Sequence, residues 1–281
     1  MRTIDTSIIK YNVKSLLLEA NYDIGERTLN ILKQKYDEES MDVPKFVLEQ
    51  IIKNDEIAVA EKIPMCQDTG VAIVFLEIGQ EVNLTGDYLY DEVNQGVREA
   101  YDYGYLRKSV VSDPVYERIN TKDNTPAIIH TDIVPGNKVK ITVAPKGFGS
   151  ENMSAVKMLK PSDGIEGIKS FVINTVKKAG PNPCPPIIVG VGIGGTFEKC
   201  TYMSKKALTR EIGEHNTDKR YSDLEEELLK EINKLNIGPA GLGGRTTALS
   251  VNIEYFPTHI AGLPVAVNIC CHAYRHRKTI I

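Results

Sequence analysis

Apolar residues recur at helical spacing through the first 60 positions of the chain. Three such stretches are SIIKYNVKSLLLEA, RTLNILKQKY and VPKFVLEQIIK, and each would gather its apolar side chains on one helix face. Pro44, at the start of the third stretch, suits the first turn of a helix. We therefore predict that residues 1–62 form a helical N-terminal portion.

After residue 70 the pattern changes to short apolar runs that are typical of β-strands. Residues 71–78 predict a strand, and the next helix is expected to open near Thr85–Asp87 and to end at Gly104. Two further runs, PAIIHTDIV and KVKITVAP, are separated by PGN. This turn signal predicts a hairpin of two neighbouring strands.

Helices and strands continue to alternate through the second half of the chain. Helices are predicted for SDGIEGIKSFVINTVKKAG, which has late lysines and a terminal glycine, and for the charged SDLEEELLKEINKL. Strands are predicted for PPIIVGVG, TTALSVNIEYF and LPVAVNICC. This order predicts an α+β fold, with a mixed β-sheet core flanked by helices, in a single domain spanning residues 1–281.

Charge and hydropathy exclude two classes of partner. The net charge of −3 offers no basic surface for nucleic acid or for an anionic membrane. The N-terminal MRTIDTSIIKYNVKSLLLEA mixes charged with apolar residues, unlike a signal peptide. No apolar run approaches the ~18 residues of a membrane span. We expect a cytoplasmic protein that binds neither nucleic acid nor membrane.

The five cysteines are the most informative reactive residues. Their number is odd in a chain too long to need disulfide staples, which leaves buried thiols, a reactive thiol or metal ligands. Cys66 precedes a predicted strand in MCQDTG, Cys184 lies in the proline-rich AGPNPCPPIIVG, and the pair Cys270–Cys271 ends a strand. Three converging thiolates without a fourth dedicated ligand suit a 4Fe–4S cluster with one open iron. Small buried thiols are the alternative.

The segment IIVGVGIGGTFEKC contains a formal G-x-G-x-x-G at Gly190, Gly192 and Gly195. It follows a predicted strand and opens a helix, as in dinucleotide-binding proteins, so an NAD-binding oxidoreductase is one hypothesis. Fewer than 100 residues follow, without the regular strand–helix alternation of such a domain. A tight strand-to-helix turn, or backbone N–H groups lining a site for an anion, are the other interpretations.

Several long motifs together resemble one known family, in order, from about residue 40 to the C-terminus. The sequence is similar to the α part of the class I, iron–sulfur-dependent fumarases and the related tartrate dehydratases. The motifs are MCQDTGVAIVFLEIG, YLRKSVVSDP, PKGFGSENMSAVKMLKPSDG, CPPIIVGVGIGGTFEKC and GLGGRTTALSVNIEYFPTHIAGLPVAVNICCHAYRH.

The resemblance implies a cofactor and its ligands. The cysteines that hold the 4Fe–4S cluster in that family match Cys66, Cys184 and Cys271. Cys270 replaces a residue that is not a ligand, and Cys200 matches no ligand position, so a buried thiol is expected there. The implied reaction is the reversible hydration of fumarate to malate, in which the open iron binds substrate oxygens.

The same resemblance implies the residues that handle the small dicarboxylate substrate. Gln67 and Asp68 would contact it, Asp68 with a catalytic role as well. Arg107 would clamp a carboxylate, and Gly149 would offer a backbone N–H. His259 matches a histidine at the edge of the site that transfers a proton or orients substrate. The remaining histidines receive no role.

The resemblance also implies a partner. In the family a second module supplies further arginine and lysine clamps and a threonine base, whereas this sequence stops ten residues after Cys271. We expect a separate β subunit, in a homodimer or an α2β2 heterotetramer, and little activity from this chain alone. Fumarate is the expected substrate, and L(+)-tartrate is the alternative. An NAD-binding oxidoreductase and a non-catalytic iron–sulfur subunit are alternatives of other classes.

Overall fold

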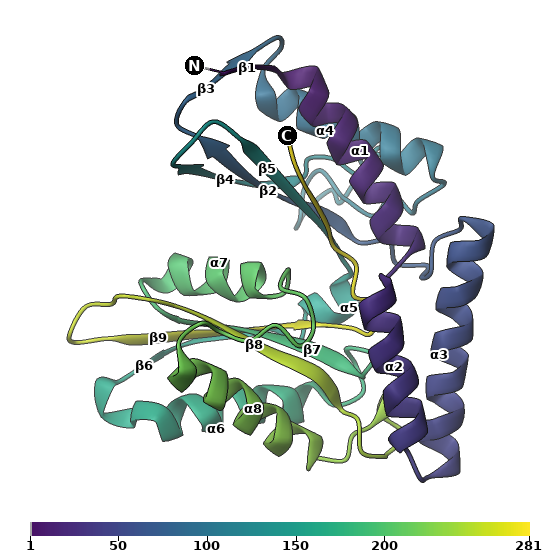
Figure 1. Ribbon diagram of the computed structural model, residues 1–281, viewed down its shortest axis with the longest axis vertical. Coiled ribbons are helices and arrows are strands. Elements are labelled where there is room, and N and C mark those ends of the chain that lie inside the picture. The colour runs from purple at the N-terminus through teal and green to yellow at the C-terminus, as the bar shows by residue number, and fades with distance from the viewer. Residues whose placement is uncertain (1) are drawn as a thin grey trace. The chain divides into compact units, whose positions relative to one another are not determined.

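The computed structural model describes residues 2–281, whose contacts divide the chain into two compact units (Figure 1). Unit 1 comprises residues 2–24, Asn54–Phe148 and Arg275–Ile281, and unit 2 comprises Gly25–Lys53 and Gly149–Tyr274. The expectation of one domain over residues 1–281 stays a prediction, because two compact units can still fold as one cooperative domain. None of the helices formed by residues 2–281 has the length and apolar character needed to cross a bilayer.

Unit 1 is built on a four-stranded sheet. Its strands, in the order β10-β5-β2-β4, are Arg277–Ile280, Val139–Lys146, Val71–Gly79 and Ile128–Val134. Helices α1 (Thr6–Tyr22) and α4 (Leu89–Tyr103) pack on each other and contribute to its core, and a small parallel pair joins β1 (Arg2–Asp5) to β3 (Val82–Thr85). Ile9, Leu76 and Ile141 are fully buried in this core. Burial of such side chains stabilises the unit by roughly 1.5–3 kcal/mol each.

The predicted hairpin of residues 126–145 is wrong. Strand β4 pairs parallel with β2, β5 pairs antiparallel with the other side of β2, and so the two strands do not touch. The PGN segment instead passes over the end of β2. A methyl group on Gly79 would lie 2.3 Å from the carbonyl oxygen of Gly136, so only glycine permits this crossing.

Unit 2 has a second four-stranded sheet, with helices on both faces (Figure 1). Its strands, in the order β6-β9-β7-β8, are Ala155–Leu159, Leu263–Cys270, Ile187–Gly194 and Ala248–Phe256. Helix α7 covers one face, and α6 and α8 cover the other. These helices are Phe197–Ala207, Gly164–Ala179 and Lys219–Asn233. The unit also includes α2 (Glu26–Glu38) and the short turns η1 (Pro161–Asp163) and η2 (Pro239–Gly241).

Two helices span the boundaries in the chain between the units. Helix α3 (Asp42–Glu61) contains the boundary at Lys53, and the short α5 (Phe148–Glu151) contains the boundary at Phe148.

The two sheets have the same strand order and the same strand directions. In each, the central strand (β2 or β7) lies between a parallel strand that follows it in the chain (β4 or β8) and an antiparallel strand that comes next (β5 or β9). The fourth strand, β10 or β6, pairs antiparallel with the last of these. The start of each central strand pairs with the end of β5 or β9. The segment before the central strand and the segment after β5 or β9 therefore lie at the same end of the sheet, which is the sheet edge referred to below. Those segments carry most of the predicted site residues.

The helical N-terminal portion is confirmed in α1, α2 and α3, although the first described residues form β1. The α+β class is confirmed as well. The helix predicted to open near residues 85–87 begins at Leu89, because Val82–Thr85 pairs with β1. Strands β1, β3, β6 and β10 have no counterpart among the predictions, since each has only four or five residues.

Candidate functional site

Asp68 lies in the loop between α3 and β2, and both of its carboxylate oxygens are held by backbone N–H groups of unit 1. Oδ1 accepts from Gly70 N–H at 3.0 Å, and Oδ2 accepts from Phe148 N–H at 3.0 Å. Such charge-assisted bonds fix the plane of the carboxylate. The Phe148 side chain is half-exposed, and its backbone N–H is the donor to Asp68.

Two glycines make this close approach possible. Gly70 has φ +78°, in the left-handed region, and a methyl group there would lie 2.6 Å from the backbone carbon of Lys146. Since Val71 pairs with Lys146 across β2 and β5, the loop turns directly onto the sheet edge. Any larger residue at position 70 would push the Asp68 loop away from β5.

Buried side chains hold the same loop from behind. The hydroxyl of Tyr101, on α4, shares its proton between the carbonyl oxygens of Thr69 (3.0 Å) and Gly70 (2.8 Å). Nδ2 of Asn124 donates to the same Gly70 oxygen at 3.1 Å. Burial raises the pKa of Tyr101 well above its ordinary value, so the phenol stays a donor at neutral pH.

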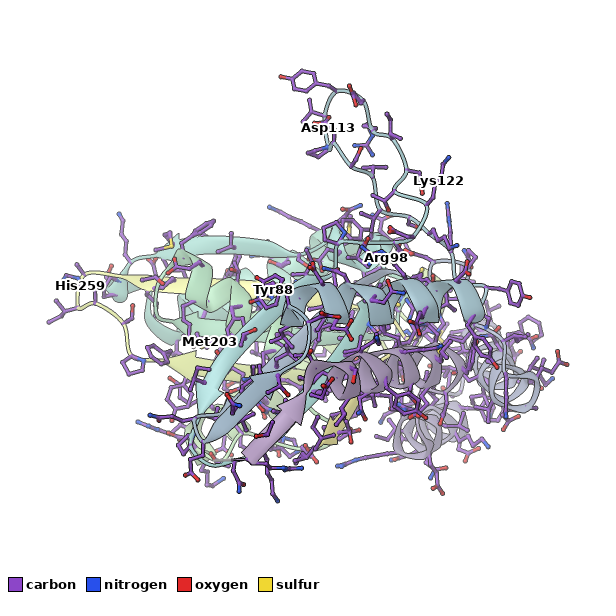
Figure 2. All side chains as sticks on the ribbon, turned by 90° about the horizontal axis from the view of Figure 1, so that it is seen from above. Tyr88, Arg98, Asp113, Lys122, Met203 and His259 are labelled. Carbon is purple, nitrogen blue, oxygen red and sulfur yellow. The ribbon has the colours of Figure 1, made fainter. Side chains whose placement is uncertain are left out.

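The predicted clamp Arg107 is tied to this loop through its backbone. The hydroxyl of Thr69, next to Asp68, donates to the Arg107 carbonyl oxygen at 3.1 Å. The Arg107 side chain is exposed. Beyond it, the segment of residues 108–122 projects away from α4, as the labelled Asp113 and Lys122 show in Figure 2. The structure thus brings Arg107 beside the Asp68 loop.

Cys66 and Gln67 stand immediately before Asp68. The Cys66 side chain is half-buried, and its Sγ lies 3.6 Å from Oε1 of the exposed Gln67. The start of this loop is fixed by asparagines: Met65 N–H donates to the Asn21 carbonyl at 3.0 Å, and Asn54 Nδ2 donates to the Met65 carbonyl at 2.8 Å. Unit 1 therefore presents a thiol, an amide and a carboxylate on one rigid loop.

Unit 2 brings the other two predicted cysteine ligands together. Cys184 precedes β7, is exposed and has φ +53°, a conformation that non-glycine residues rarely adopt. Its carbonyl oxygen accepts from the N–H of His272 at 3.3 Å, so the residue after Cys271 is bonded directly to Cys184.

Gly149 lies near the Cys184 loop. A methyl group on Gly149 would come 3.8 Å from the carbonyl oxygen of Asn182, two residues before Cys184. The helix that carries Gly149 is anchored by an ion pair between Glu151 and Lys205 of α7, and Asn268 Nδ2 lies 3.4 Å from Glu151 Oε2. Sequence reasoning missed Glu151 and Lys205, because their pairing depends on the packing of α7.

Cys200 and Cys270 are in other surroundings. Cys200 is fully buried on α7, as expected, its Sγ lies 3.2 Å from the Phe197 carbonyl oxygen, and burial raises the pKa of its thiol. A raised pKa disfavours the thiolate that a metal requires. Cys270 is the buried last residue of β9, opposite Ile188.

Two of the three glycines in the G-x-G-x-x-G pattern allow α7 to pack closely on β7. Gly190 and Gly192 lie within β7, beneath α7. Methyl groups there would lie 2.2 Å from the Ser204 carbonyl oxygen and 2.0 Å from that of Cys200. Only Gly194 and Gly195, with φ +87° and +67°, form the turn into α7.

His259 lies apart from Cys184 and Cys271 within unit 2. It is exposed in the connection between β8 and β9, where Figure 2 labels it, and its Nδ1 accepts from Ala261 N–H at 3.2 Å. His259 precedes β9 and Cys271 follows it, so the two residues stand at opposite ends of an eight-residue strand. A strand of that length spans about 26 Å.

Thiolates are soft ligands, so the three predicted cysteines suit an iron–sulfur cluster better than a hard cation. Within residues 2–281, no group of three His, Cys, Asp or Glu side chains is arranged around one metal ion. Cys66, on a loop fixed by Asn21 and Asn54, and Cys184, adjacent to the Cys271 segment, are the thiols presented at the sheet edges.

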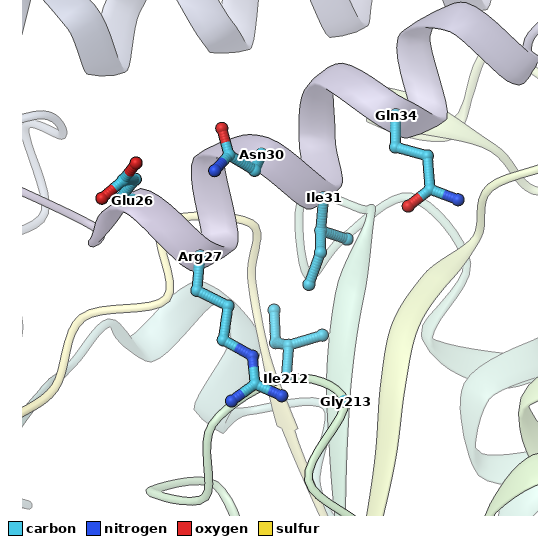
Figure 3. Close-up of a pocket in the computed structure, with 7 residues that line it drawn as sticks. All are labelled: Glu26, Arg27, Asn30, Ile31, Gln34, Ile212 and Gly213. Atoms are coloured by element: carbon cyan, nitrogen blue, oxygen red, sulfur yellow. The ribbon is translucent and has the colours of Figure 1, made fainter.

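The pocket in Figure 3 lies elsewhere in unit 2. It is lined by α2 residues that include Glu26, Arg27 and Gln34, and by Ile212 and Gly213. It is widely open, and none of the predicted site residues lines it.

Comparison with known proteins places this arrangement in a family. The pattern of the family described as Fumarate hydratase (Fumerase) matches residues 10–280. A provisionally named L(+)-tartrate dehydratase subunit alpha of Methanocaldococcus jannaschii is 47% identical over 267 residues, which covers 94% of each chain. The L(+)-tartrate dehydratase subunits alpha of Escherichia coli O157:H7 and Shigella sonnei are 34% and 33% identical, over 89% of this chain and 83% of theirs.

Proposed function

The chain belongs to the fumarate hydratase family of class I, iron–sulfur-dependent hydro-lyases, and we propose that it is the α subunit of an L(+)-tartrate dehydratase. The observation that carries this proposal is the 47% identity, over 94% of both chains, to a relative named for that subunit. The motifs alone favoured fumarate as substrate. The names of the relatives favour tartrate, the alternative, and we adopt it here.

The reaction removes water from tartrate. One carbon loses its hydroxyl, its neighbour loses a proton, and the resulting enol becomes oxaloacetate. When bound, a 4Fe–4S cluster with one open iron supplies a Lewis acid for the departing hydroxyl. We propose Cys66, Cys184 and Cys271 as its ligands, because two of them lie on adjacent loops of unit 2 and the third adjoins Asp68.

The polar residues around Asp68 would bind and orient the dicarboxylate. Arg107 would hold one carboxylate in a bidentate pair, and Gln67 would donate to the other end or to a hydroxyl. Asp68, whose oxygens are fixed by Gly70 and Phe148, would orient the hydroxyl that departs. Gly149 would add a backbone N–H.

The relatives are named as α subunits, and we propose a β subunit that completes the site and supplies the base, in a heteromeric assembly such as α2β2. His259 then has a specific place. About 26 Å of strand separates it from Cys271 of its own chain, so it would serve a site in another copy of this chain.

The test is anaerobic co-expression of this chain with its β partner, followed by assays with L(+)-tartrate, malate and fumarate. We expect a brown complex with the highest kcat/KM for tartrate. A higher value for malate or fumarate would assign the chain to fumarate hydratase, the second candidate, which the family description supports. A cluster without activity towards any of the three would indicate a non-catalytic iron–sulfur subunit. Bound NAD without iron would indicate an oxidoreductase.

A further inference from the structure

Arg275 has a guanidinium group buried in unit 1. The side chain follows the Cys271 segment in the chain and is 3% exposed. One terminal nitrogen donates to Oδ1 of Asn21 at 3.1 Å, whereas its Nε has no hydrogen-bond partner among residues 2–281. A buried cation is costly unless a negative charge lies close to it. The negatively charged side chain closest to Arg275 therefore indicates the role of this arginine.

Asp68 is a carboxylate that, like Arg275, lies next to Gly147. A methyl group on Gly147 would come within 3.1 Å of Asp68 Oδ2 and within 3.5 Å of the second terminal nitrogen of Arg275. The missing side chain of Gly147 therefore lets both charged groups approach the same piece of backbone. Both charges also act on the buried phenol of Tyr101. Burial is the main cause that raises the pKa of Tyr101; the positive charge of Arg275 acts to lower this pKa, and the negative charge of Asp68 acts to raise it.

Asn21 gives the arginine a fixed orientation. Its Oδ1 accepts from Arg275, its Nδ2 donates to the Leu17 carbonyl of α1 at 2.9 Å, and its own carbonyl accepts from Met65, next to Cys66. One asparagine thus connects the guanidinium to helix α1 and to the loop that carries Asp68. A planar guanidinium held at one corner has little freedom left.

We propose that Arg275 is a positioning residue for Asp68, holding its carboxylate against the Gly147–Phe148 backbone in the orientation that substrate requires. This inference rests on the proposed hydro-lyase function. Arg275 acts through charge and fixed geometry, and it does not itself touch substrate. Lysine would keep the charge but would lose the planar fork that donates to Asn21 from one terminal nitrogen and places the other next to Gly147.

The experiment uses the anaerobically assembled complex with the β partner. Arg275→Met is expected to lower kcat for L(+)-tartrate by at least about tenfold, because a 1 Å misplacement can cost about 100-fold, while KM changes little. Arg275→Lys should recover part of the loss. Arg220→Met, which removes an exposed arginine paired with Asp218, should leave kcat unchanged. Iron content should be the same in all variants.

A double substitution separates positioning from general structural support. If Arg275 acts through Asp68, Asp68→Asn with Arg275→Met should be no slower than Asp68→Asn alone. Multiplicative losses in the double variant, or wild-type kcat in Arg275→Met, would overturn the inference.

Gly147→Ala provides a second route if Arg275→Met loses its iron. It keeps every charge but places a methyl group 3.1 Å from Asp68 Oδ2, so kcat should fall by at least about fivefold with iron retained.

A crystal structure of Arg275→Met tests the inference without an activity measurement. In Arg275→Met the bond from Phe148 N–H to Asp68 should be lost, and an unchanged 3.0 Å bond would refute the inference. A displaced Asp68 in a complex whose wild type is inactive would leave the inference standing and reject the proposed function.

Discussion

Replacing Tyr101 by phenylalanine tests the loop architecture with a single oxygen atom. Tyr101 is fully buried, and its hydroxyl donates to the Thr69 and Gly70 carbonyls. The Gly70 oxygen keeps its bond from Asn124, whereas the Thr69 oxygen loses its donor from Tyr101. A lost buried hydrogen bond costs roughly 0.5–1.5 kcal/mol, and an acceptor left unpaired costs about 1–3 kcal/mol. We expect the free energy of unfolding to fall by about 2 kcal/mol.

The assay is urea unfolding at pH 7.5, followed by far-ultraviolet circular dichroism. Tyr11→Phe is the matched control, because the Tyr11 side chain is 70% exposed, and its free energy of unfolding should stay within about 0.5 kcal/mol of wild type. If Tyr101→Phe were equally silent, the hydroxyl would not hold the Asp68 loop.

Alkaline pH provides an internal check on the same variant. Burial raises the pKa of Tyr101 in the folded state above the ordinary value of about 10 that applies when the chain is unfolded. Its stabilising contribution is therefore complete below pH ~10 and is lost as pH rises from there towards the folded pKa. In that pH range, Tyr101 lowers the free energy of unfolding by about 1.4 kcal/mol for each pH unit. The gap between wild type and Tyr101→Phe should narrow above pH ~10, and a constant gap would contradict the burial argument.

Three other predictions follow from particular contacts. Cys271→Ser should abolish iron binding, measured as iron per chain and visible absorbance, whereas Cys200→Ser and Cys270→Ser should be mild; loss of iron in Cys270→Ser alone would move the ligand by one residue. Gly192→Ala places a methyl group 2.0 Å from the Cys200 carbonyl and should cost about 1–3 kcal/mol in thermal unfolding, whereas Gly262→Ala, with neighbours at 4.0 Å, should be neutral. Glu225→Ala removes a buried carboxylate that pairs with Arg210 and accepts from Ile253 N–H, and should cost about 3–5 kcal/mol in urea unfolding. Glu254→Ala, which removes an exposed partner of the same arginine, should cost less than about 1 kcal/mol, and equal losses would refute the role of burial.

Local signals in the sequence were enough for most elements but not for strand pairing. Helical spacing identified α1, α2 and α3, and continuous apolar runs identified β2 and β7. The PGN turn suggested a hairpin, yet β2 lies between β4 and β5. Nothing near the turn reveals this, because the parallel pairing of β2 with β4 spans more than 50 residues of chain.

The MCQDTG motif directed attention to the Asp68 loop, whereas the residues that support this loop through packing could not be predicted from the sequence. Tyr101, Asn124 and Asn21 support the Asp68 loop from distant parts of the chain, and their sequence surroundings look like ordinary helix or loop. Arg275 was visible within CCHAYRH, but its burial and its neighbour Asp68 emerge only from the fold.

The repeated strand order has a consequence for how such enzymes diversify. In each unit the central strand is fixed by its core, and the proposed site residues Cys66, Asp68, Cys184 and Cys271 lie just before it or just after its antiparallel neighbour. Substitutions in these connecting segments alter what the sheet edge recognises without disturbing either core. A few changes in these segments can therefore alter the side chains at this edge while retaining the same scaffold.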